Sequence, residues 1–421
     1  MRTTLSTFLE SLIITLGIYL AANSQGLDVI GSCPTPDKAW AIHVDGTYAY
    51  VACDSSGLEV IDVTDPTTPT IVASYDTPGR AIDLFVAGQY AYIADYSSLQ
   101  IINISNPLSP AYAGSHPAYG TIGVHVDGDY AYLASGYHPP VIEILNISNP
   151  ASPESTSSLT FLGGAFDLYC SSGYLCALSN ETEPYANYLR IVDVSDPHNP
   201  IVSGSIRIPG DVEIPWDVKV IEDYAYVADG AEGLQIVNIT DPVHPVVVGS
   251  YDTPGNATGV FVSDDYAFIA DHSNGVQLVN VLDPTNPTFL SECDTDGQAL
   301  GIYATGGYAY VADWYSLVIL RYNPTGVGEE KRWLGEFSLS HNYPNPFNIR
   351  TIIRYALPKA SNVSIEVYSL LGHKVAILVN GPVQAGPQTV TWDASDFPSG
   401  LYFYRLRSGS KVLTGRMSMV K

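Results

Sequence analysis

Histidine, lysine and aspartate recur at two positions of one short apolar segment, and these side chains can carry acid–base chemistry. The first position holds His43, His125 and Lys219, and the second, two residues earlier, holds Asp83, Asp167 and Asp217. If they converge in one channel, an acid–base site is conceivable. Other copies of the segment have aromatic residues, glycine or alanine at these positions. That mixture favours packing, with the carboxylates bonded to neighbouring backbone, and we assign no catalytic residue.

A second set of carboxylates ends another recurring segment, at Asp95, Asp229, Asp271 and Asp313. Carboxylates gathered on one face could attract a cation such as calcium. No compact Asp-x-Asp-x-Asp-Gly loop is present, however, which favours turn capping and solubility over a metal site. We therefore expect no cofactor, with calcium as the alternative.

The irregular loops offer a third kind of site, because insertions on one face of a repeat protein often build its binding surface. The candidate ligand-binding residues in these loops are Tyr137, His138, Tyr185, Arg207 and Trp216. Aromatic and guanidinium groups of this kind suit a carbohydrate or peptide. Unspecialised variation of surface loops is the alternative.

A repeated phrase determines where all these residues lie. Tyr-Ala-Tyr-Val-Ala or a near variant begins at seven tyrosines, spaced 40 to 50 residues apart: Tyr48, Tyr90, Tyr130, Tyr174, Tyr224, Tyr266 and Tyr308. A fixed period of strand-like segments indicates a solenoid or a toroidal array whose units bury their faces against their neighbours.

The clearest unit, residues 257–297, predicts four short strands at 258–262, 266–270, 276–281 and 288–292. Turn residues separate them, as in an antiparallel meander. Both faces of the meander are apolar, so it must be covered on both sides, like one blade of a β-propeller. The seventh unit lacks a fourth strand, and residues 27–32 match the missing one. The sequence predicts an all-β, seven-bladed propeller closed by its N-terminal strand.

Paired prolines such as Pro242 and Pro245 follow the third strand in six units, where they are expected to stiffen a turn. Asn103, Asn146 and Asn238 fit the glycosylation sequon. Their shared repeat position favours capping of the same turn.

Charge divides the chain in two. Residues 25–328 hold 36 acidic and 6 basic side chains, whereas residues 337–421 hold 3 and 9. The acidic part is therefore unsuited to nucleic acid. We expect a signal peptide at 1–24, a propeller at 25–326, a linker at 327–336 and a small Ig-like β-sandwich at 337–421. No later stretch could span a membrane as a helix.

Five cysteines are an odd number for an exported protein. Cys170 and Cys176 flank one predicted hairpin turn and are the only pair close in sequence. The two cysteines need not lie opposite each other in the hairpin, so the sequence does not decide whether they form a disulfide.

The run Gly-Leu-Gln-Ile-Val-Asn-Ile-Thr-Asp-Pro, from Gly233 to Pro242, follows a copy of the tyrosine phrase. Together they resemble the LVIVD-repeat family of exported propeller proteins, over roughly residues 27–324. The resemblance implies the propeller architecture and supplies no catalytic residues.

The last 85 residues predict strands at 350–357, 362–369, 389–392 and 400–406. Their motifs include Asn-Tyr-Pro-Asn-Pro-Phe-Asn from Asn342, Val-Thr-Trp-Asp from Val390 and Ser-Gly-Leu-Tyr-Phe-Tyr from Ser399. They resemble the type A C-terminal sorting domain of the type IX secretion system. The resemblance implies passage through that machinery to the cell surface or medium of a Gram-negative bacterium.

Two functions fit these observations. The first is a noncatalytic surface or secreted scaffold that binds an unidentified extracellular protein or glycan. The alternative is a secreted hydrolase or lyase that acts on glycans with the channel carboxylates. Facing carboxylates across an open channel would favour the enzyme, and a filled channel would favour binding.

Overall fold

The computed structural model describes residues 26–136, 141–161, 163–182, 185–210, 214–322, 337–343, 347, 349–370, 372–395, 397–409 and 411–419. The chain forms two compact units, with the boundary between Asn323 and Pro324. All regular elements in the described ranges are strands, and no helix there is long and apolar enough to cross a membrane. The predicted signal peptide and linker lie outside the described residues.

Four blades of the first unit are separate four-stranded antiparallel sheets. Blade one has β2 (Ala41–Asp45), β3 (Tyr48–Ala52), β4 (Leu58–Asp62) and β5 (Thr70–Tyr75). Blade four has β13 (Ala165–Ser171), β14 (Tyr174–Thr182), β15 (Tyr185–Asp193) and β16 (Ile201–Ile208). Blade five has β17 (Asp217–Ile221), β18 (Tyr224–Ala228), β19 (Leu234–Asn238) and β20 (Val246–Tyr251). Blade six has β21 (Gly259–Ser263), β22 (Tyr266–Ala270), β23 (Val276–Asn280) and β24 (Thr288–Cys293).

Blades two and three share one long strand, β9 (Ala111–Asp127), which is the outer strand of blade two and the inner strand of blade three. Blade two also has β6 (Asp83–Ala87), β7 (Tyr90–Ala94) and β8 (Tyr96–Asn103). Blade three continues with β10 (Tyr130–Ser135), β11 (Val141–Asn146) and β12 (Glu154–Thr160). In every blade the tyrosine phrase forms the second strand, because its small alanines and β-branched residues fit between two covered faces.

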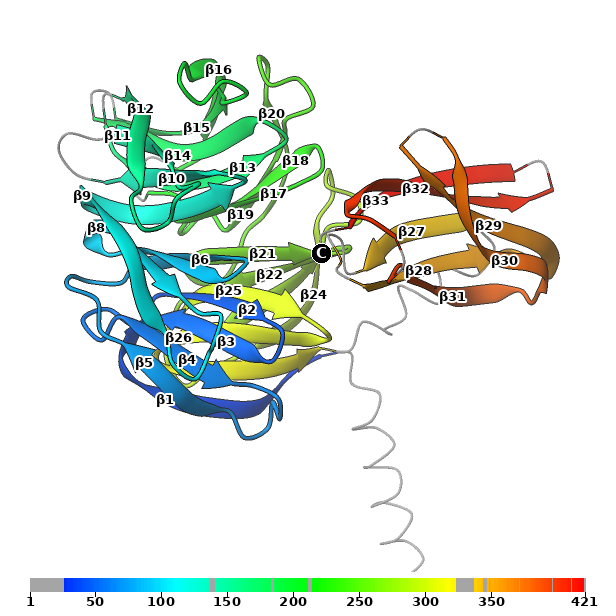
Figure 1. Cartoon of the computed structure of the whole chain (residues 1–421), viewed down its shortest axis with the longest axis horizontal. Coiled ribbons are helices and arrows are strands. Elements are labelled where there is room, and N and C mark those ends of the chain that lie inside the picture. Colours follow the sequence, from blue (N-terminus) through cyan, green and yellow to red (C-terminus); the bar gives the residue numbers. More distant parts are fainter. Residues whose placement is uncertain are drawn as a thin grey trace, which may run out of the picture. The chain divides into compact units, whose positions relative to one another are not determined.

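The N-terminal strand closes the ring, as the sequence predicted (Figure 1). Blade seven consists of β25 (Ala299–Thr305), β26 (Tyr308–Tyr322) and β1 (Leu27–Ala39). β1 pairs antiparallel with β26 from Leu27 opposite Tyr322 to Ala39 opposite Trp314. The inner strands contact each other in succession around the ring, and the last, β25, contacts the first, β2.

A glycine in the outer strand of a blade lies against the proline turn of the next blade. A Cβ at Gly249 would lie 2.1 Å from the Pro284 carbonyl oxygen, so only glycine allows this approach. Gly31 of β1 makes the same approach to Pro66, at 2.2 Å. β1 therefore occupies the place of an ordinary fourth strand.

The asparagines of the three sequons cap the turn after the third strand, as predicted. The Oδ1 atom of Asn238 accepts a hydrogen bond from the Thr240 backbone N–H at 3.0 Å, and Asn103 and Asn146 make the same contact. All five cysteines are free thiols. Cys170 pairs with Leu175 and Cys176 with Tyr169, so the two cysteines are out of register for a disulfide.

The second unit is a sandwich of two antiparallel sheets. One sheet has β27 (Ser338–Tyr343), β28 (Arg350–Leu357) and β31 (Gly386–Asp393). The other has β30 (Lys374–Val383), β29 (Ser361–Ser369), β32 (Gly400–Ser408) and β33 (Lys411–Met419). Trp392, Tyr404 and Met417 are buried in its core.

Candidate functional site

The seven inner strands bring one side chain each into the channel, and most of these side chains contact their neighbours around the ring. The channel ring consists of His43, Phe85, His125, Tyr169, Lys219, Phe261 and Tyr303. The ring centroids of neighbours lie 4.4 Å apart for Phe85–His125 and His125–Tyr169, 4.5 Å for Phe261–Tyr303, 4.8 Å for Tyr303–His43 and 5.4 Å for His43–Phe85. Lys219 Nζ lies 5.3 Å from the centroid of Tyr169. Side chains packed against one another therefore line the channel at this level, and His125 is the one ring member that is buried rather than half-buried.

The three channel aspartates join neighbouring blades. Asp83 Oδ2 accepts a hydrogen bond from the Val124 N–H at 2.8 Å. Asp167 and Asp217 accept the equivalent bonds from Val218 at 2.9 Å and Val260 at 2.8 Å. Each carboxylate thus satisfies a backbone donor on the inner strand of the next blade. The structure brings together all six residues that the sequence placed in the channel, and it gives the aspartates a structural contact.

The charged groups of the channel affect the pKa values of Lys219, Asp83 and Asp167. Burial alone would lower the pKa of Lys219, but nearby Asp217, Tyr169, Asp167 and Asp83 raise it above its usual value. Burial raises the pKa of Asp83 to about 7 and that of Asp167 well above its usual value. Burial and the Lys219 charge lower the pKa of His43 to about 3. The imidazole of His43 is therefore neutral near pH 7 and a poor proton donor there.

The second set of aspartates lies beneath the connections between blades. Asp95, Asp229, Asp271 and Asp313 are each at most 2% exposed. Asp271 accepts hydrogen bonds from the Thr253 hydroxyl at 2.7 Å and the Gly255 N–H at 2.9 Å. Asp95 and Asp313 accept the equivalent threonine bond. Burial raises the pKa of Asp95, Asp271 and Asp313.

This arrangement fixes the incoming connection to blades two, six and seven. No group of three His, Cys, Asp or Glu side chains that could hold a metal occurs within the described ranges. The calcium site stays a prediction.

The predicted ligand surface of blades three to five is only partly covered by the structure. Tyr137 and His138 lie outside the described residues, and Tyr185 is described as the first backbone position of β15. Arg207, on β16, is exposed, and Trp216, just before β17, is 45% exposed.

Sequence reasoning missed a row of aromatic and cationic side chains across blades seven, one and two. This aromatic strip consists of Tyr315, Trp314, Lys38, Trp40, Arg80, Tyr96 and Tyr119. The Trp40 and Trp314 ring centroids lie 6.2 Å apart, and those of Tyr96 and Tyr119 lie 5.6 Å apart. Lys38 Nζ lies 4.2 Å from the Trp314 centroid. Tyr119 is 70% exposed and Tyr315 52% exposed, so both ends of the strip meet solvent.

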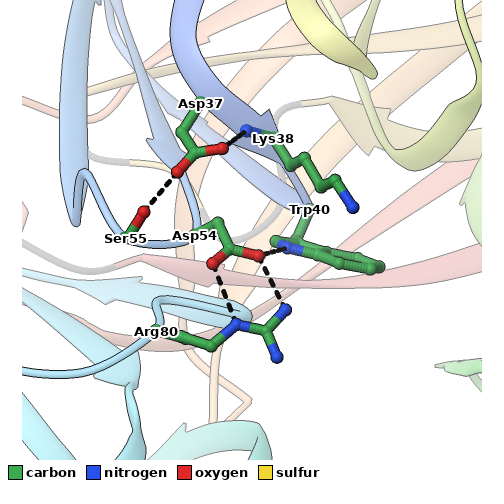
Figure 2. A network of polar contacts seen from close by, with 6 residues as sticks. All are labelled: Asp37, Lys38, Trp40, Asp54, Ser55 and Arg80. Atoms are coloured by element: carbon green, nitrogen blue, oxygen red, sulfur yellow. Dashed lines mark hydrogen bonds and ion pairs between the residues drawn. The ribbon is translucent and has the colours of Figure 1, made fainter.

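Asp54 joins the two halves of the strip (Figure 2). Its carboxylate accepts two hydrogen bonds from Arg80, at 2.9 Å and 2.7 Å, and one from Trp40 Nε1 at 2.9 Å. The hydrogen bonds from Arg80 are the main cause that lowers the pKa of the Asp54 carboxyl. A bidentate pair of this kind fixes both side chains in orientation. Trp40 and Arg80, from the two connections that flank blade one, are therefore held as one preformed surface.

The strip also contains strained backbone. The residue six positions after the tyrosine that begins the repeated phrase has a positive φ in five blades; it follows a buried aspartate in four of them and Cys53 in blade one. The angles are 38° at Asp54, 54° at Tyr96, 54° at Gly230, 51° at His272 and 60° at Trp314. Glycine adopts this conformation without cost, whereas a tyrosine or tryptophan there is strained. Strained positions of this kind cluster where a protein binds ligands.

Two features of the sequence could have indicated the strip. Only six basic side chains occur in residues 25–328, and Lys38 and Arg80 are two of them. Tryptophan stands just before the inner strand at Trp40 and again at the matching position, Trp216. Lys38 and Trp40 lie near Trp314 only because ring closure brings the first blade connection beside the last blade.

Comparisons with known proteins support the architecture. The β-propeller domain of Cps50 (Swd1) from Myceliophteria thermophila is similar, with a TM-score of 0.56 at 8% identity, over 70% of this chain and all of that chain. The computationally designed Ika8 protein gives a TM-score of 0.52 at 6% identity, over 71% of this chain and all of that one. At these identities the likeness concerns the fold alone. A search of curated proteins finds no match.

Family models match both parts of the chain. Residues 341–420 match the secretion system C-terminal sorting domain, which identifies the protein as secreted or exposed at the cell surface. The LVIVD repeat model matches residues 36–77, 78–117, 121–160, 185–207, 214–253, 254–295 and 296–320. These seven regions cover more than half of the 421 residues, so the chain belongs to the LVIVD-repeat family.

Proposed function

We propose that the propeller is a noncatalytic binding scaffold that the sorting domain delivers to the cell exterior. The observation that carries this proposal is the channel ring, because aromatic and imidazole side chains packed against one another line the place where a propeller enzyme would hold its substrate. The aromatic strip provides the contact surface for an extracellular protein or glycan. Tryptophan, tyrosine and arginine are the side chains that contribute most often to tight contacts.

The competing proposal, an enzyme that acts on glycans, rests on the channel carboxylates. Asp83, Asp167 and Asp217 each hold a backbone N–H of the next blade, and they share one cation, Lys219. A catalytic acid and base need free access to the substrate. These contacts favour a structural role for the three aspartates.

Replacing Tyr119 and Tyr315 together with alanine is expected to weaken ligand binding by about 10- to 100-fold, because the exposed ends of the strip lose their contact area. Glycan arrays and pull-down experiments with wild-type protein identify the ligand, and titration of the double variant measures the loss. Tyr112→Ala is the matched control. Tyr112 is 57% exposed but lies on the outer part of β9, away from the strip. Equal affinity of the double variant and wild type would disprove the assignment of the strip.

Deleting residues 337–421 is expected to trap the propeller in the periplasm, because the deletion removes the domain that the export machinery recognises. Immunoblotting of periplasm, cell surface and medium would measure the distribution. Since the propeller is a separate compact unit, it should still fold there. The full-length chain expressed in the same way is the control. Undiminished secretion of the truncated chain would contradict the role of the tail.

A further inference from the structure

A pocket of about 640 Å³ lies at the seam where β1 closes the propeller. Its walls come from β1 of blade seven and from β4, β5 and the β3–β4 loop of blade one. β1 loses its pairing with β26 between Pro34 and Ala39, and this irregularity leaves room beside blade one. We call this space the seam pocket.

Glu59 is the most unusual side chain of the seam pocket. It lies on β4 opposite Ser74 of β5, and both residues line the pocket. Glu59 is only 3% exposed, and no hydrogen-bond or ion-pair partner for it exists among the described residues. Burial alone raises the pKa of its carboxyl to about 7. A buried carboxylate without a protein partner is costly, and a cation that bonds it would relieve that cost.

The same repeat position in other blades shows what Glu59 lacks. The equivalent residues in blades two to six are Gln100, Glu143, Arg190, Gln235 and Gln277. Each of them has a protein partner. The partners are Ser98 at 2.8 Å, His116 at 3.1 Å, Glu181 at 2.8 Å, the Glu232 carbonyl at 2.8 Å and Glu292 at 3.4 Å. Glu59 is the exception, and its blade is the one with the pocket.

The lining defines the chemistry of the ligand. Glu59 and Asp76 provide two carboxyl groups, and no Lys, Arg or His lines the pocket. Pro34, Pro36 and Ile71 provide apolar surface, and the remaining lining side chains carry hydroxyls. A cation offsets the charge of a buried carboxylate, and an apolar wall accepts methylene groups.

We propose that the seam pocket binds an alkylammonium group, with its nitrogen on the Glu59 carboxylate and its methylene chain against Pro34, Pro36 and Ile71. The group could belong to a free amine or to a lysine side chain of a partner. This inference is independent of the aromatic strip and of the proposed scaffold function.

The proposal predicts a particular pH dependence. Binding needs the Glu59 carboxylate, so affinity should fall by about 30-fold from about pH 8 to about pH 5.5, as Glu59 is protonated. The other titratable groups that face Glu59 are Cys33 on β1, Cys53 after β3, and Asp76 after β5. Burial raises the pKa of both thiols, which therefore stay neutral across this range.

The test is a calorimetric titration of the purified chain with 1,4-diaminobutane, with Nα-acetyl-lysine methylamide and with neutral 1,4-butanediol. We expect saturable binding of an amine at about pH 8, and a loss of about 10- to 100-fold in Glu59→Gln. Glu143→Gln is the matched control, because it makes the same change at the same repeat position of blade three. It should bind amines like wild type.

The two amines distinguish the source of the ligand. Binding of the diamine alone indicates a free amine, and binding of the lysine derivative indicates a protein side chain. Equal binding of the diol and the diamine, or equal amine affinity of Glu59→Gln and wild type, would overturn the proposal. Failure of all amines to saturate at millimolar concentrations would overturn it as well.

Discussion

Deletion of residues 26–36 is expected to lower the thermal midpoint of the propeller by about 10 °C or more. The deletion removes the fourth strand of blade seven and leaves β26 without its outer partner. Leu27 is buried in the cluster that joins blades six and seven, and Cys33 in the cluster that joins blades seven and one. Lost burial and backbone pairing together cost at least ~5 kcal/mol, and each kcal/mol corresponds to about 2 °C in a domain of this size.

Differential scanning calorimetry of the deletion variant measures the effect. Leu27→Asp and Val29→Asp provide a matched pair of point variants on the same strand. Leu27 is 6% exposed and Val29 is 50% exposed, so only the first should lower the midpoint by several degrees. A synthetic peptide with residues 25–39 should restore stability to the deletion variant. An unchanged midpoint after the deletion would mean that β1 does not hold the ring together.

The strands could be predicted from the sequence because their signals are local. The predicted segment 266–270 is β22 and the predicted segment 350–357 is β28, each with the same bounds. The β-branched and aromatic residues of these segments lie between clear turn signals. β30 was not predicted, since its exposed and half-buried residues do not alternate regularly and two irregularities interrupt its pairing with β29.

The candidate sites depend on contacts that no local pattern encodes. Trp40 and Trp314 are far apart in the sequence and meet only because the last blade lies beside the first. Glu59 likewise lacks a hydrogen-bond partner because of the side chains that surround it in the folded protein, which its own repeat does not specify. The channel was predictable, because each of its residues occupies the same position in its own repeat. The channel ring is therefore predictable from the repeat, whereas the aromatic strip and the seam pocket depend on contacts at the seam between blades seven and one.

Replacement of Lys219 by methionine is expected to destabilise the propeller by about 3–5 kcal/mol at about pH 8. The change removes the cation that faces Asp217, Asp167 and Asp83 and leaves their carboxylates to repel each other. The loss should shrink at about pH 5.5. Asp83 and Asp167 have pKa values raised above those of the unfolded chain, so their ionised forms destabilise the fold and protonation relieves the strain. Urea unfolding at both pH values measures the difference.

Lys38→Met is the matched control, because Lys38 contacts an aromatic ring as Lys219 does, but lies in the aromatic strip. Its loss should cost no more than about 1 kcal/mol. Adding Asp217→Asn to Lys219→Met should recover part of the stability, because one of the repelling charges is gone. If Lys219→Met were as mild as Lys38→Met at both pH values, the carboxylates would have to be solvated in an open channel. Such a channel would contradict a noncatalytic scaffold, since an open channel with free carboxylates is what a glycan-cleaving enzyme requires.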